Sequence, residues 1–135
     1  MDRPFFKTYW PGLAWFFIMG VLLFMPGTDV PEPETWLKKI FFDKWVHAGL
    51  FGTLAALIMY AQRSNAKNFK QIRTRLILTA LCIIGWGLAT EYIQRDYCIS
   101  RGFDLWDWGA DILGILIVLT YQLYAAYRLT AKNPH

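Results

Sequence analysis

The sequence predicts an all-α membrane protein, a bundle of four transmembrane helices with both termini in the cytoplasm. Composition, long apolar stretches and the distribution of Lys and Arg predict this fold class. Of the 135 residues, 56% are hydrophobic and only 18% are charged, whereas soluble domains average about 25% charged residues. An aromatic content of 18% excludes a disordered chain, and two cysteines are too few for a disulfide scaffold. The length suits a single membrane domain over residues 1–135.

Four apolar stretches match the roughly 17–25 residues that a helix needs to cross a bilayer. Their period and length exclude strands, because no alternation of period 2 is present. The first two stretches are uncharged, whereas the third must include Glu91 and the fourth Asp107 and Asp111 to reach this length. We expect helices over about 9–26, 45–62, 76–94 and 105–127.

The segment between the first two helices changes character along its length. Pro26, Pro31 and Pro33 predict an irregular start. Apolar residues at helical spacing follow Thr35, a suitable N-cap, and they predict a short interfacial helix at about 35–43. No small-x-small cleavage pattern follows the first apolar stretch, so we expect it to stay as an anchor.

Basic residues fall mainly on one side of the predicted bundle. Nine Lys and Arg lie in the two terminal segments and between the second and third helices, against five on the other side. Because Lys and Arg favour the cytoplasmic side, we expect both termini there, in the bacterial cytoplasmic (inner) membrane. The net charge of +4 is then a topology signal, and we expect no nucleic-acid partner.

Polar residues of three predicted helices meet at one depth, near the outer face. Their spacings of three, four and seven place neighbouring members on shared helix faces. The predicted ligand-binding residues are Asp43, Lys44, His47, Glu91, Gln94, Arg101, Asp104, Asp107 and Asp111. Pairs of small residues four apart, which let membrane helices approach closely, accompany them at Ala48/Gly52, Gly85/Ala89 and Ala110/Gly114.

This polar group has two interpretations. An ionisable residue inside a span is costly and indicates function. The alternative is a structural clasp, in which His47 bonds a carboxylate and Arg101 pairs with Asp104 or Asp107. A solvated helix start explains Asp43 and Lys44 equally well, and Gln94 suits a hydrogen bond at a helix end.

The same residues suit two kinds of chemistry. His47 and Glu91 are candidate catalytic residues, because an imidazole beside a carboxylate supplies an acid–base pair. His47, Glu91, Asp107 and Asp111 also suit a divalent ion. The chain lacks HExxH or another tight ligand spacing and has two histidines, so we expect no metal and no cofactor.

The order of these residues resembles the VanZ-like family of small bacterial membrane proteins, named for teicoplanin resistance. The resemblance is carried by Asp43-Lys44-x-x-His47, Glu91-x-x-Gln94 and Arg101-x-Phe103-Asp104-x-x-Asp107, followed by a polar residue and Gly114. Asp111 stands where the family often has Asn. The resemblance implies four helices and a role in the cell envelope or in antibiotic resistance, without a defined chemistry.

The sequence therefore predicts an outward-facing polar pocket at headgroup depth. The expected ligand is an envelope lipid, a lipid-linked precursor or a glycopeptide-type molecule. The alternative is a membrane enzyme that acts on a lipid or glycolipid headgroup by His/Glu acid–base chemistry. Membrane-protein partners and a homo-oligomer both stay open.

Overall fold

Four helices form the structure, a computed structural model that describes residues 5–24, 42–64, 68–97 and 103–132. They are α1 (Phe5–Phe24), α3 (Phe42–Ser64), α4 (Phe69–Tyr97) and α5 (Leu105–Lys132). Each is long and apolar enough to cross a membrane. The prediction of four apolar helices is confirmed.

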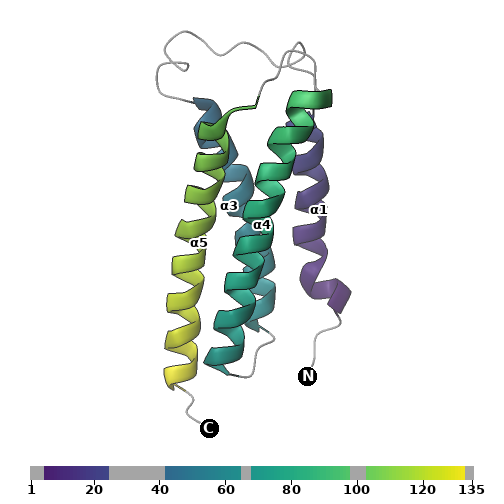
Figure 1. The fold of residues 1–135 in the computed structure, drawn as a ribbon. Helices are drawn as coiled ribbons and strands as arrows, with labels where there is room; N and C mark the ends of the chain where they lie inside the picture. Colours follow the sequence, from purple (N-terminus) through teal and green to yellow (C-terminus); the bar gives the residue numbers. More distant parts are fainter. Residues whose placement is uncertain (1–4, 25–41, 65–67, 98–102, 133–135) are drawn as a thin grey trace.

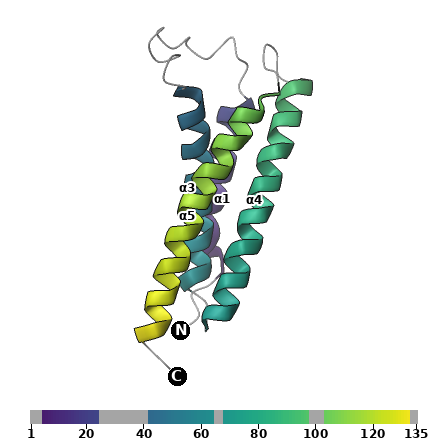
Figure 2. The same cartoon turned by 60° about the vertical axis from the view of Figure 1, so that its left-hand side comes forward.

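The helices lie side by side, and each runs opposite to the one before it in the chain (Figures 1 and 2). The most extensive packing is between α3 and α5, followed by α4 on α5, while α1 packs mainly on α3. At one end of the bundle α1 and α4 end and α3 and α5 begin (Figure 1); we call this the polar end. The start of α1 and the end of α5 are both at the opposite end, on different sides of the bundle (Figure 1).

Two helices extend well beyond the predicted bounds. The structure begins α4 at Phe69 and ends α5 at Lys132, where the sequence predicted 76 and 127. Both helices continue beyond their apolar stretches into turns that carry charged residues. A prediction from the length of the apolar stretch does not include these turns. Asn68 explains the early start of α4, because its Oδ1 accepts the N–H of Gln71 at 2.8 Å and so caps the helix. Of the predicted interfacial helix at 35–43, residues 35–41 lie outside the described residues, and Phe42 and Asp43 begin α3.

Apolar side chains fill the bundle and also cover its outside. Phe51, Leu54 and Met59 of α3 are buried against Leu76 of α4 and Ile115 of α5. Large apolar side chains point outward as well, among them Phe17, Val21, Trp45, Leu81 and Ile117. A surface this apolar is unfavourable in water and is typical of a lipid-facing helix bundle.

Glycine permits the close approach of α3 and α5. A Cβ on Gly114 would collide with the backbone carbonyl oxygen of Ala48, and a Cβ on Gly52 would meet the carbonyl oxygen of Gly114 at 3.4 Å. Three of the predicted small residues, Ala48, Gly52 and Gly114, therefore lie at a helix contact. The prediction is wrong for Gly85, because a Cβ there would meet nothing within 4 Å. Two positions further on, Gly87 is buried and faces the interior instead.

We expect Gly114→Ala to destabilise the bundle by about 1–3 kcal/mol, because a backbone carbonyl cannot rotate away from the added methyl group. Gly109→Ala on the same helix is the matched control, since a Cβ there would meet nothing within 4 Å, and alanine favours helix. Melting in detergent, followed by circular dichroism, measures both. Equal melting temperatures for the two variants would contradict the close approach.

Candidate functional site

Seven ionisable residues gather at the polar end, in the first turns of α3 and α5, in the last turns of α4 and just before α5. We call them the polar cluster: Asp43, Lys44, His47, Glu91, Asp104, Asp107 and Asp111. All seven were predicted from the sequence. The structure joins them through hydrogen bonds and ion pairs that cross between the helices.

Asp104 caps α5 and does not lie on it. The helix begins at Leu105, and Asp104 Oδ1 accepts the backbone N–H of Trp106 at 2.8 Å, which is the usual N-cap bond. The sequence placed Asp104 on one helix face with Asp107 and Asp111, but the chain turns into the helix one residue later. An acid at a helix N-terminus also interacts favourably with the helix dipole.

Lys44 links three aspartates. Its Nζ donates to Asp43 at 2.8 Å, to Asp104 at 2.6 Å and to Asp107 at 2.5 Å. The Lys44 side chain is only 19% exposed. Solvation at the start of a helix therefore does not explain Lys44. In the clasp interpretation the pairing with Asp104 or Asp107 belongs to Arg101, which lies outside the described residues. The hydrogen bond from Lys44 holds the pKa of Asp104 below its usual value.

His47 is buried between two aspartates of α5. Its Nδ1 lies 3.1 Å from Asp111 Oδ1, a hydrogen-bond distance, and its Nε2 lies 3.8 Å from Asp107 Oδ2. One carboxylate thus fixes one ring nitrogen, and the second approaches the other nitrogen. The predicted bond from His47 to a carboxylate is present, and Asp111 is its partner.

Glu91 is fully buried near the end of α4. Its Oε2 accepts the backbone N–H of Asp104 at 3.0 Å, and this bond ties α4 to the start of α5. The contact crosses from one helix to the chain just before another, so side-chain spacing in the sequence gives no sign of it.

Two carboxylate oxygens of the polar cluster are buried without a hydrogen-bond partner among the described residues: Glu91 Oε1 and Asp111 Oδ2. Asp111 Oδ2 lies close to Gly87, where a Cβ would come within 3.0 Å of it. The absence of a side chain at Gly87 therefore makes room for the carboxylate. A buried acceptor without a donor destabilises the folded protein, so such atoms are rare and indicate a missing partner.

Two groups of the polar cluster could hold a metal ion, each with its ligand atoms within 4.8 Å of one another. His47, Glu91 and Asp111 form the buried inner group. The outer group consists of the remaining aspartates, namely Asp43, Asp104 and Asp107. The sequence had grouped Asp107 with the inner residues, but the structure pairs it with Lys44.

Gln94 does not join the polar cluster. Its Nε2 donates to the backbone carbonyl of Leu23 at 2.8 Å, close to the end of α1. Gln94 therefore makes the predicted hydrogen bond at a helix end, here the end of α1. Two indole N–H groups act similarly, from Trp108 to the carbonyl of Ile84 and from Trp15 to that of Leu50. Residue spacing in the sequence gives no sign of these two bonds.

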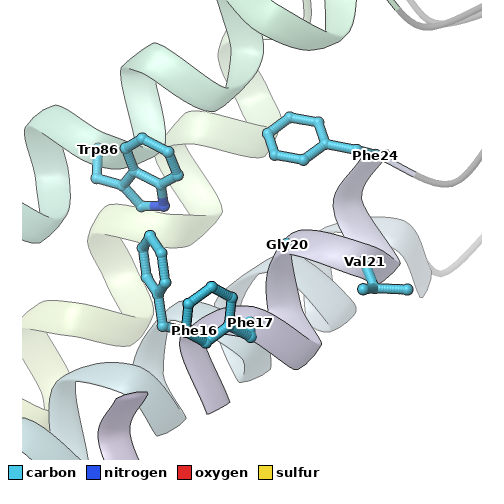
Figure 3. Close-up of a pocket in the computed structure, with 6 residues that line it drawn as sticks. All are labelled: Phe16, Phe17, Gly20, Val21, Phe24 and Trp86. Atoms are coloured by element: carbon cyan, nitrogen blue, oxygen red, sulfur yellow. The ribbon is translucent and has the colours of Figure 1, made fainter. Parts of the chain in front are cut away.

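An apolar hollow lies between α1 and α4. It is lined by Phe16, Phe17, Gly20, Val21, Phe24 and Trp86 (Figure 3). Phe24 is the last residue of α1, so the hollow reaches the polar end and extends inward along the helix. The indole nitrogen of Trp86 is buried without a hydrogen-bond partner among the described residues.

Comparisons with models of known protein families, with curated proteins and with solved structures found no match for this chain.

We expect Asp104→Asn to reduce the loss of stability in acid. Because the pKa of Asp104 is lowered by folding, its ionised form stabilises the fold above about pH 4, and this contribution is lost as the pH falls through the folded-state value. Asparagine is an equally good N-cap, so the variant removes the charge and keeps the cap. The Asp104 side chain is 40% exposed, which limits the effect to below about 1 kcal/mol.

Melting temperatures from about pH 6 down to about pH 3 measure the effect. Lys44→Met is the matched variant, because it keeps Asp104 and removes the donor that lowers its pKa. The acid-induced decline should be smaller in both variants than in the wild type. A decline in Asp104→Asn as steep as in the wild type would refute the pairing.

Proposed function

We propose that this chain is a multi-pass protein of the bacterial cytoplasmic membrane, with both termini in the cytoplasm and the polar end outside. The four apolar helices support membrane insertion. Basic residues support the orientation, because Arg63, Lys70, Arg73, Arg75 and Arg128 all lie on helix turns near the end opposite to the polar end.

We propose further that the polar end binds an envelope lipid or a lipid-linked precursor at headgroup depth. The observation that carries this proposal is the pair of buried carboxylates, Glu91 and Asp111, each with an oxygen that no described residue satisfies. Ionisable groups are costly inside an apolar bundle and mark ligand sites there. The acids and His47 would contact hydroxyl or amine groups of the ligand, and Arg101 its phosphate.

The apolar hollow supports a lipid over a wholly polar ligand. It begins at Phe24 at the polar end and continues past Gly20 to Phe16, along the direction in which an acyl chain enters a bilayer. An amphipathic molecule could place its chain there while its headgroup lies over the ends of the helices. The indole N–H of Trp86, which has no hydrogen-bond partner within the described part of the chain, would suit an ester carbonyl.

The resemblance to the VanZ-like family supports an envelope role within this proposal, including glycopeptide-type ligands and antibiotic resistance. Residues that carry the resemblance lie far apart in the sequence. Lys44, His47, Glu91, Asp104 and Asp107 nevertheless belong to one polar cluster. Such convergence fits a motif that is defined by a shared site.

A second candidate function is an enzyme that acts on a lipid or glycolipid headgroup. The contact between His47 and Asp111 favours it, since a carboxylate that orients an imidazole is a common feature of general bases. Glu91 lies close enough to act as the partner acid. Lipid analysis of a deletion strain separates the two functions, because an accumulated precursor indicates catalysis.

The orientation predicts that Tyr97→Cys is labelled from outside and Lys70→Cys is not. Both positions are exposed at helix ends, Tyr97 at the polar end and Lys70 at the opposite end. A membrane-impermeant maleimide is applied to intact cells that express each variant after Cys82 and Cys98 are replaced by serine. Labelling of Lys70→Cys alone would reverse the orientation.

Lipid binding predicts that Gly20→Leu removes most of the lipid that stays with the purified chain. A Cβ on Gly20 meets nothing within 4 Å, so the leucine should enter the hollow without disturbing the helices. Gly49→Leu is the control, because it is an outward-facing position of α3 that also has open space. Native mass spectrometry counts the lipids that each variant retains.

Glu91→Gln and Arg101→Ala test the headgroup contacts in the same experiment. We expect both variants to retain less lipid than the wild type, by about tenfold for a lost charged contact of about 1.4 kcal/mol. If Gly20→Leu, Glu91→Gln and Arg101→Ala all retain as much lipid as the wild type, the proposal of lipid binding is wrong.

A further inference from the structure

The inner group of the polar cluster has the composition of a metal site. His47 comes from α3, Glu91 from α4 and Asp111 from α5, and one ligand atom of each lies within 4.8 Å of the others. All three side chains are buried, with Glu91 and Asp111 at 0% exposure. Three helices therefore direct one nitrogen and two oxygen ligands to one point inside the bundle.

The two free oxygens of this group point to a missing cation. Glu91 uses Oε2 for the N–H of Asp104, and Asp111 uses Oδ1 for His47, while Oε1 and Oδ2 have no partner among the described residues. Two neighbouring carboxylates that are buried in an apolar bundle repel one another and lose hydration. A positive charge between them would remove both costs.

Lys44 does not supply that charge to the inner group. Its ammonium donates to all three members of the outer group, at 2.5–2.8 Å. An ammonium has three N–H donors, so these contacts use all of them. The outer group thus already holds a cation, and the inner group holds none among the described residues.

We propose that His47, Glu91 and Asp111 bind one divalent transition-metal ion, of the class of Zn²⁺ or Mn²⁺. Imidazole nitrogen combined with carboxylate oxygen suits these ions. The 3.1 Å between His47 Nδ1 and Asp111 Oδ1 matches two neighbouring ligands at about 2.0–2.2 Å from one ion. Asp111 would bind the ion through both carboxylate oxygens, so that Oδ2 also gains a partner. With Nδ1 on the ion, Nε2 faces Asp107, which is the second carboxylate that commonly orients a metal-bound histidine.

Three protein ligands leave coordination positions open, as in catalytic metal sites. This inference uses the same two oxygens as the proposed function, Glu91 Oε1 and Asp111 Oδ2, but it does not depend on lipid binding, because the ion needs no lipid to bind. It also replaces the expectation of no metal that ligand spacing in the sequence had suggested.

The test uses the full chain, purified in detergent, stripped with a chelator and titrated with Zn²⁺ or Mn²⁺. We expect one ion per chain by calorimetry and by elemental analysis, and a rise in melting temperature when the ion is added. Glu91→Gln and Asp111→Asn should weaken binding at least about tenfold, since even residues that only orient ligands cost about 10–100-fold. Asp96→Asn is the matched control, because Asp96 is exposed on α4 and pairs with Arg95.

A second measurement serves if the variants fold poorly. The chain has two histidines, His47 and His135, so bound Mn²⁺ in the His135→Ala variant should show magnetic coupling to a nitrogen of His47. Absence of that coupling, or of one-equivalent binding by the wild type, overturns the site. Binding that survives in folded Glu91→Gln and Asp111→Asn but is lost in Asp104→Asn overturns it too. Gly20→Leu should still bind the ion, which separates this result from a failure of lipid binding.

Discussion

The close approach of α3 and α5 is the constraint on which the polar end depends. Gly114 lets the backbone of α5 reach the carbonyl oxygen of Ala48, the residue after His47. Asp111 lies one turn before Gly114 and therefore meets His47 at 3.1 Å. Any side chain at position 114 would push the two helices apart, and the imidazole would lose its carboxylate. Packing between small residues thus sets the geometry of an electrostatic contact.

Charge is divided between two layers of the polar end. In the outer layer Lys44 pairs with aspartates that are partly exposed. Both water and the ammonium therefore stabilise the charges of these carboxylates. In the inner layer Glu91 and Asp111 are cut off from water, and a backbone N–H and an imidazole are the donors that reach them. The same residue types therefore act differently at two depths, because burial raises the cost of every unpaired charge.

The sequence predicted the helices and all members of the polar cluster, because both follow from local rules. Apolar length identifies a span, and spacing of three or four places Asp43 and His47 on one face. Contacts between helices could not be predicted from these local rules. The partner of Asp104 is Lys44, sixty residues away, and Gly87 rather than Gly85 faces the interior. Rotation of each helix about its axis decides these contacts, and it is set by the packing of the whole bundle.

Hydrogen-bond capacity distinguishes a structural clasp from a binding site. A clasp lowers the free energy of the fold by satisfying its own members, as Gln94 does when it binds the carbonyl of Leu23. Glu91 and Asp111 differ, since each commits one oxygen to the fold and leaves the other buried without a partner among the described residues. Holding such oxygens costs stability in the absence of a ligand. A cation or a polar headgroup that bound these two oxygens would remove that cost. The inner layer therefore has the features of a binding site, and the outer layer has those of a structural clasp.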